Sequence, residues 1–193
     1  MILAPDPGRY DRIVWLSLIS LFLHQLEEYR VPGTFPGMIN RAMFGSGQPD
    51  RYPLNTNTAL IINAGIGWTG YFLAALLGTR AVWLGIATIL VSLGNLVAHT
   101  LLFNIRGRTL YNAGLATSWL LFAPLAYLFF RVVHGEQLAT ATDYWIGIPL
   151  GIAINVFGVF KMVTWLADKD TPFAFGRRNL LRSDRDPTTI RPS

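Results

Sequence analysis

The sequence contains no cysteine and few charged residues. Without thiols it has no disulfide framework, no thiolate metal site and no cysteine nucleophile. Charged residues make up 14% of the chain, whereas a soluble domain usually carries about 25%. This deficit, together with 52% hydrophobic residues among 193, is not typical of a soluble domain and predicts an integral membrane protein.

The hydrophobic residues form five long runs, each long enough to cross a bilayer core of about 30 Å as a helix. The predicted fold is an all-α membrane bundle of about five transmembrane helices, with a single domain over residues 1–167. The first run is expected to be a retained helix and not a signal peptide, because no small-residue cleavage site follows it. The expected helices cover residues 11–29, 58–77, 81–103, 111–133 and 144–166.

Two segments lie outside these runs. Residues 30–57 mix prolines and glycines with apolar side chains, and we expect an interfacial loop whose middle, residues 36–44, is a short amphipathic helix. This loop is either a lid over a site or a plain connector. Residues 168–193 are basic, and we expect them to form a disordered cytoplasmic tail.

The distribution of arginine predicts the orientation in the membrane. Five crossings place the two termini on opposite sides, and the C-terminal side receives most of the loop arginines and the basic tail. The positive-inside rule makes this side cytoplasmic. We therefore expect a multi-pass protein of the bacterial inner (plasma) membrane with its C-terminus in the cytoplasm. The net charge of +5 is then a topology signal and only weakly a sign of nucleic-acid binding.

Polar residues that are costly in a membrane fall at one depth of the predicted bundle. Ionisable groups within membrane spans mark functional sites by default. The direction of each run brings these residues to the cytoplasmic half, which predicts one shared polar cavity and not scattered contacts between helices. The predicted site residues are His24, Glu27, Glu28, Asn95, His99 and Tyr111.

The spacing of these residues suggests a metal site. His24 lies three residues before Glu27 and four before Glu28, so each pair shares a helix face. A histidine and a glutamate one turn apart can bind one metal ion, and His99 could supply a second imidazole with Asn95 as its orienting residue or as a donor to substrate. The predicted ligands of a divalent metal, Zn or Fe, are His24, Glu27, Glu28 and His99. Without metal, the same groups could act as general acid and base. The non-functional alternative is a structural ion pair at a helix end.

Three motifs resemble those of the HXXEE family of small multi-pass membrane proteins. His24-Gln25-Leu26-Glu27-Glu28 matches the first motif in full, and Asn95-Leu96-Val97-Ala98-His99 matches the second, Asn-x-x-x-His. The third, Tyr-x-Pro-Gly, is met in part by Tyr111-Asn112-Ala113-Gly114, where alanine replaces proline. The resemblance implies an integral membrane enzyme whose substrate and reaction are uncharacterised.

Together these observations predict a membrane enzyme with a His/Glu site in the cytoplasmic half of the bundle. Its partners would be the lipid bilayer and a lipid-like or amphipathic substrate that enters under the 30–57 loop; no nucleic acid is expected, and the oligomeric state is not indicated. The alternative function is a proton-coupled small membrane transporter in which Glu27 or Glu28 carries the proton. The apolar character of the non-cytoplasmic halves disfavours this alternative, because it offers no polar path across.

Overall fold

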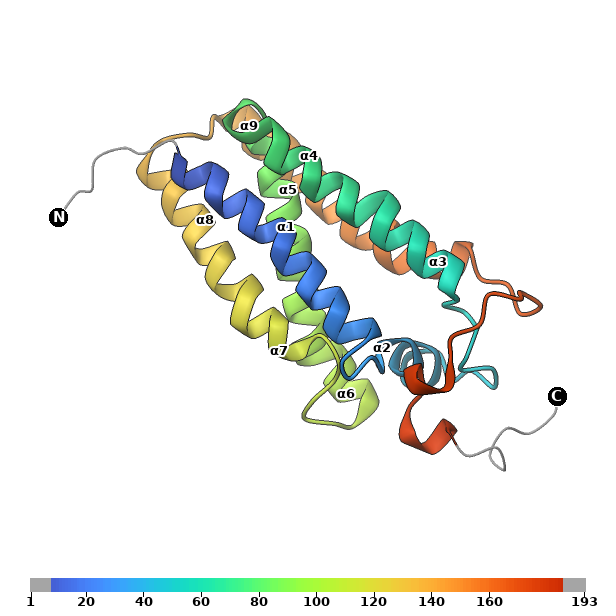
Figure 1. The fold of residues 1–193 in the computed structure, drawn as a ribbon. Helices are drawn as coiled ribbons and strands as arrows, with labels where there is room; N and C mark the ends of the chain where they lie inside the picture. Colours follow the sequence, from blue (N-terminus) through green and yellow to red (C-terminus); the bar gives the residue numbers. More distant parts are fainter. Residues whose placement is uncertain (1–7, 186–193) are drawn as a thin grey trace.

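Five helical rods form the body of the protein in the computed structural model, which describes residues 8–185 (Figure 1). The described part contains no strand, so the all-α prediction is confirmed. The rods are α1 (Gly8–Tyr29); α3 (Thr56–Leu60), η2 (Ile61–Trp68) and α4 (Thr69–Leu77); α5 (Val82–Val97), η4 (Ala98–Leu102) and α6 (Phe103–Gly107); α7 (Leu115–Thr117), η5 (Ser118–Phe122) and α8 (Ala123–Gly135); and α9 (Ala141–Ala153), η6 (Ile154–Lys161) and α10 (Met162–Trp165).

Local capping residues account for the ends of several rods. The Asn55 side chain accepts a hydrogen bond of 2.9 Å from the backbone of Thr58 and so caps α3. Thr140 and Asp143 form a reciprocal capping box at the start of α9. These caps place the starts of the second and fifth rods slightly earlier than the apolar runs predicted.

A glycine reverses the chain between the second and third rods. Gly78 adopts φ 54° and ψ −133°, and the 3-10 turn η3 (Gly78–Ala81) leads into α5. A Cβ at Gly78 would lie 2.5 Å from Asp11 Oδ1, so both the backbone conformation and the neighbouring side chain require glycine. As a result α4 and α5 run antiparallel (Figure 1).

Three helical stretches are long and apolar enough to cross a membrane: Thr56–Gly107, Leu115–Gly135 and Ala141–Trp165. The first of these contains the turn at Gly78 and therefore consists of two rods. α1 is not among the three, and its distribution of side chains is unusual. Its exposed positions include Leu16, Ile19 and Leu23, whereas Ser17, Ser20, His24, Glu27 and Glu28 are buried.

The two ends of the bundle differ in what they bury. The end that contains the start of α1 and the end of α8 is filled by aromatic and aliphatic side chains, among them Tyr10, Ile86 and Phe129. We call this end the packed half. The opposite end, which contains the end of α1 and the start of α7, buries two histidines and two glutamates, and we call it the site half.

The 30–57 loop covers the site half and contains the short helix that the sequence predicted. The helical segment consists of α2 (Phe35–Gly37) and η1 (Met38–Met43). Asn40 is fully buried within the loop, where its amide bonds to the backbone of Pro49 and Leu54. These bonds hold the loop in a defined conformation over the end of the bundle.

The sequence predicted a disordered tail over residues 168–193. For residues 168–185, which the structure describes, this prediction is corrected. Residues 168–185 pack against the site half and include the short turns η7 (Arg177–Asn179) and η8 (Arg182–Asp184). The Asn179 amide donates to the carbonyls of Tyr29 and Gly33 at 2.9 and 2.8 Å, which a composition-based argument does not detect. The remainder of the tail, like residues 1–7 of the predicted domain, lies outside the described residues.

Candidate metal centre

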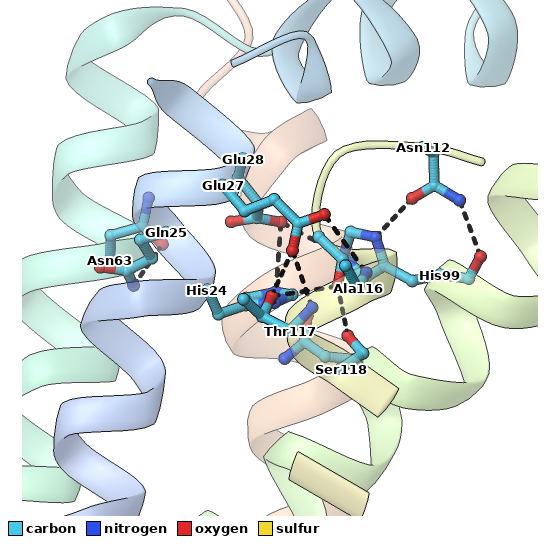
Figure 2. A network of polar contacts seen from close by, with 12 residues as sticks. His24, Gln25, Glu27, Glu28, Asn63, His99, Asn112, Ala116, Thr117 and Ser118 are labelled. Atoms are coloured by element: carbon cyan, nitrogen blue, oxygen red, sulfur yellow. Dashed lines mark hydrogen bonds and ion pairs between the residues drawn. The ribbon is translucent and has the colours of Figure 1, made fainter. Parts of the chain in front are cut away.

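Three predicted residues from two rods converge in the site half. His24 Nε2 lies 3.5 Å from Glu28 Oε1, and His99 Nε2 lies 3.3 Å from the same oxygen. One ligand atom from each of the three residues lies within 4.8 Å of the other two, and all three side chains are buried (Figure 2). His24 and Glu28 are one turn apart on α1, and His99 comes from η4 across the bundle.

Hydrogen bonds orient both imidazole rings. His99 Nδ1 lies 2.6 Å from Asn112 Oδ1, whose amide nitrogen donates to the His99 carbonyl and to Asn104. The Asn112 oxygen therefore accepts from His99, so the proton is on Nδ1. His24 Nδ1 lies 2.9 Å from Thr117 Oγ1, which itself donates to Glu27 and so accepts from His24. With Nδ1 of each ring bonded in this way, Nε2 of each ring faces Glu28.

These Nε2 atoms have no hydrogen-bond partner among the described residues, although both are buried. Hydrogen bonds between charged nitrogen and carboxylate atoms measure about 2.7–2.9 Å, shorter than the separations from Glu28. Two ligand atoms that each lie about 2.0–2.1 Å from a tetrahedral ion are about 3.3 Å apart. The separations of 3.3 and 3.5 Å from Glu28 match those of ligands of one ion, and the third pair, between the two histidines, lies within 4.8 Å.

Aromatic rings surround the two histidines. The His24 ring lies 4.6 Å from Phe122, and the His99 ring lies 4.9 Å from Phe103 and 5.5 Å from Phe35. Phe35 belongs to the loop that covers the site half, so the loop supplies one wall of the centre. This apolar shell limits contact with water and strengthens electrostatic interactions inside it.

Glu27 differs from Glu28 although the two are adjacent in the sequence. Its carboxylate accepts hydrogen bonds from the backbone of Ala116 at 3.2 Å and of Thr117 at 2.8 Å, and from the Thr117 hydroxyl at 2.6 Å. It thereby anchors the first turn of α7, next to the centre (Figure 2). Of the four predicted ligands, the structure brings His24, Glu28 and His99 together, and the Glu27 carboxylate bonds to α7 instead.

Tyr111 supports Glu27 from outside the centre. Its hydroxyl donates to Glu27 Oε1 at 2.7 Å, and the side chain is about half exposed. Burial of the hydroxyl, followed by its hydrogen bond to the Glu27 carboxylate, raises the pKa of Tyr111 to about 12. The phenol therefore remains a donor at neutral pH. The structure thus places Tyr111 against Glu27, and its predicted role as a contact of the substrate stays a prediction.

Gly114, in the partly matched third motif, allows His99 to approach the loop closely. Its φ of 106° lies in the region that favours glycine, and a Cβ would lie 2.7 Å from His99 Nδ1. The neighbouring Ala113, which stands where the motif has proline, is buried. The glycine of the motif is thus explained by the packing of the loop against the second histidine.

Two residues carry roles that the sequence did not assign to them. Asn112, which the sequence analysis named only as part of the third motif, orients His99. This was one of the two roles predicted for Asn95. The Asn95 amide instead donates to the Val91 carbonyl at 3.0 Å, and Asn95 lines a cavity beside the centre. The position of Asn112 within the third motif was the available signal for it. Thr117 lies outside all three motifs, and nothing in the sequence distinguishes it.

A cavity of about 130 Å³ adjoins the centre. It lies between α1, η2 and α4 on one side and α5 and η6 on the other, and the loop containing Phe35 closes one end of it. His24 and Glu28 lie on its wall, and most of the other lining side chains are apolar. The centre is therefore accessible from an apolar cavity within the bundle.

Comparison with protein families matches residues 15–129 to the family described as "Protein of unknown function with HXXEE motif". The chain belongs to this family. The matched region covers more than half of the chain and contains all three residues of the candidate centre together with Asn112 and Thr117. Comparisons with curated proteins and with solved structures found no match. The family match thus covers the residues of the candidate centre, and its description assigns no reaction.

Proposed function

We propose that this HXXEE protein is a multi-pass membrane enzyme that depends on a divalent metal ion and acts on a lipid-like or amphipathic substrate. The observation that carries the proposal is the convergence of two buried, unpartnered imidazole nitrogens on Glu28. This convergence lies next to an apolar cavity, so a metal site and a binding site for an apolar group adjoin each other.

The placement of side chains on α1 supports a membrane location beyond composition alone, because apolar residues such as Leu16 and Leu23 face outward and polar residues face inward. A helix at the surface of a soluble protein shows the opposite arrangement. At about 1.5 Å per residue, the 22 residues of α1 span roughly 33 Å, enough for a bilayer core. With α1 and both rods of Thr56–Gly107 included, the bundle crosses the membrane five times.

The orientation follows from the positive charges around the site half. The 30–57 loop and the segment after α10 both lie at this end of the bundle and both carry several arginines. By the positive-inside rule the site half faces the cytoplasm. The membrane is then the bacterial inner membrane expected from the sequence. A substrate would then reach the centre from the cytoplasmic leaflet or from the cytoplasm.

The donor set suits a catalytic metal ion. Two histidines and one glutamate are the protein ligands of several catalytic zinc sites, and the same set binds non-haem iron. A bound divalent ion would supply Lewis acidity next to the cavity. Hydrogen bonds from the other ring nitrogens to Asn112 and Thr117 fix the rings in the orientation that ligands need.

The remaining residues of the site have supporting roles in this proposal. Glu27 holds the first turn of α7 and thereby Thr117, and Tyr111 donates to Glu27. Phe35 on the loop restricts water at the centre. Asn95 lies on the cavity wall and can offer its amide oxygen to a polar group of the substrate.

Elemental analysis of the purified protein tests the metal site. We compare wild type with His24→Ala, His99→Ala and Glu28→Gln, and we use His134→Ala as the matched control because His134 lies in α8, outside the centre. We expect about one equivalent of metal in wild type and in the control, and a loss of more than about 100-fold in affinity in the three ligand variants, because even supporting residues typically contribute 10–100-fold.

The identity of the metal then narrows the reaction class. Zinc would favour hydrolytic or other Lewis-acid chemistry, and iron would favour oxidation. Absence of metal from folded wild type after reconstitution with either ion would overturn the metal site and leave the acid–base alternative. Proton flux into vesicles that depends on Glu28 would instead favour the transporter; the apolar side chains that fill the packed half disfavour it.

A further inference from the structure

The cavity beside the metal centre extends past the ligands into the bundle. Its lining includes Glu28 and His24 near the end of α1, and also Leu21, one turn deeper on the same helix. Tyr71 and Thr88 line its inner part, where the Tyr71 hydroxyl donates to the Thr88 carbonyl at 2.7 Å. The polar groups at this inner part are therefore already paired, and the space between them and Glu28 is bordered mainly by apolar side chains.

The dimensions of the cavity restrict what it can hold. Seven residues separate Leu21 from Glu28, which is roughly 10 Å along the helix axis. The volume of about 130 Å³ is close to that of an engineered cavity of about 150 Å³ that holds one benzene molecule. A single linear hydrocarbon segment fits these limits, whereas a fused-ring system such as a sterol is too large.

Two glycines keep part of this space open. Gly67 and Gly70 lie on the cavity wall, and a Cβ at Gly67 would lie 3.5 Å from Leu21 while one at Gly70 would lie 4.0 Å from Thr88. These are ordinary contact distances, so a Cβ can be added at either position without displacing its neighbours. A larger side chain there would occupy the cavity itself.

Hydrogen bonds link the edge of the cavity to an exposed side chain. Gln25 donates to Asn63 at 3.0 Å and accepts from Trp68 at 2.5 Å, and these bonds join α1 to η2 along the edge of the cavity. Trp68 is exposed on the outer surface of the bundle. An apolar chain in the surrounding bilayer is therefore next to the cavity.

We propose that this cavity binds one linear hydrocarbon chain of an amphipathic molecule, with the polar end of that molecule at Glu28 and His24. The assignment of a reaction at the polar end rests on the function proposed above. The contacts with the chain come from the apolar lining, so they stay in place when no metal is bound. The substrate is accordingly a molecule that inserts one hydrocarbon chain, either a free fatty acid or a phospholipid that inserts one of its acyl chains.

Photolabelling with two probes tests this proposal. One probe is a fatty acid with a diazirine in its chain, and the other is a phosphatidylcholine with the same group in one acyl chain. Purified wild type is labelled in lipid vesicles, and the labelled residues are mapped by mass spectrometry. The variants are Gly67→Leu and Gly70→Leu, and the matched control is Gly65→Leu, because Gly65 lies on the same segment outside the cavity with open space around it.

We expect labels on cavity residues such as Leu21 and Tyr71 in wild type and in the control. In the two cavity variants these labels should fall about tenfold, since excluding roughly two methylene groups costs about this factor in affinity. Labelling by one probe alone supports the proposal and identifies the source of the chain. Labels confined to lipid-facing residues such as Leu16, or equal cavity labelling in all variants, would overturn it.

Metal content is measured on the same samples. Cavity labelling in a protein that contains no metal would contradict the proposed metal-dependent function and still support binding of the chain. Bound metal without cavity labelling would support the metal centre and contradict binding of the chain. Retention of metal in Gly67→Leu and Gly70→Leu also shows that these variants are folded.

Discussion

The packed half and the site half of the same five rods are built on different principles. In the packed half, Tyr10, Ile86 and Phe129 fill the space between helices with apolar atoms. In the site half the same helices bury histidines and glutamates and enclose a cavity. Close apolar packing and the candidate metal centre thus lie at opposite ends, and substitutions at one end should leave the property of the other largely intact.

The difference also explains how the site half tolerates costly groups. A buried charge is destabilising unless it is paired. Glu27 is paired by hydrogen bonds from α7, and Glu28 would be paired by the proposed metal ion. The rods themselves are aligned by close packing at the other end, where Phe129 is fully buried. A rigid scaffold of this kind holds a constellation of ligands better than a flexible loop does.

The largest expected effect is a loss of stability in the packed half. Phe129→Ala should lower the free energy of unfolding by roughly 3–5 kcal/mol, because it removes a fully buried ring and leaves a cavity. Denaturant-induced unfolding in detergent measures this change, with Phe72→Ala as control because Phe72 is 46% exposed. The folded fraction should still bind metal; loss of metal from folded Phe129→Ala would contradict the separation of the two halves.

The next effect concerns the ring orientation of a ligand. Thr117→Val removes the oxygen that accepts from His24 Nδ1 but keeps the shape of the side chain. Metal affinity should fall about 10–100-fold, which is typical for the partner of a ligating histidine. Titration with a chelator measures it. Thr117→Ser keeps the hydroxyl and should restore most of the affinity, whereas an equal loss in both variants would argue against the hydrogen bond.

A smaller effect separates the two adjacent glutamates. Glu27→Gln replaces one acceptor oxygen with a donor opposite the backbone N–H groups of α7, which should cost about 1–2 kcal/mol of stability. Because the Glu27 carboxylate bonds to α7 and not to the two histidines, we expect the metal affinity of Glu27→Gln to fall less than that of Glu28→Gln. Parallel metal titrations of the two variants test this order, and equal losses would return Glu27 to the ligand set.

The smallest effect is expected at the tail. Asn179→Ala removes two hydrogen bonds to the backbone at the start of the 30–57 loop, each worth about 1 kcal/mol. Amide hydrogen exchange of residues 30–37 should become faster, while the packed half remains unchanged. Slow exchange in the variant would show that the tail does not hold the loop.

Much of this architecture could be predicted from the sequence. The apolar runs predicted all five helices, because their length and composition are local properties of the chain. The direction of the runs also placed His24, Glu28 and His99 at one depth, and the structure brings them together. The tail after residue 168 was missed because its order depends on single contacts such as that of Asn179, which composition does not reveal.

What the sequence by itself determined is the set of helices, the residues that cannot face lipid and the end of the bundle at which they lie. Only the tertiary structure decided which of these residues meet. Glu27 and Glu28 are adjacent in the chain, yet one anchors α7 and the other faces two imidazoles, because consecutive helical positions point about 100° apart toward different neighbours. Asn112 and Thr117 orient the histidines only because their rods fold against α1 and η4, and this packing is not encoded in any local pattern.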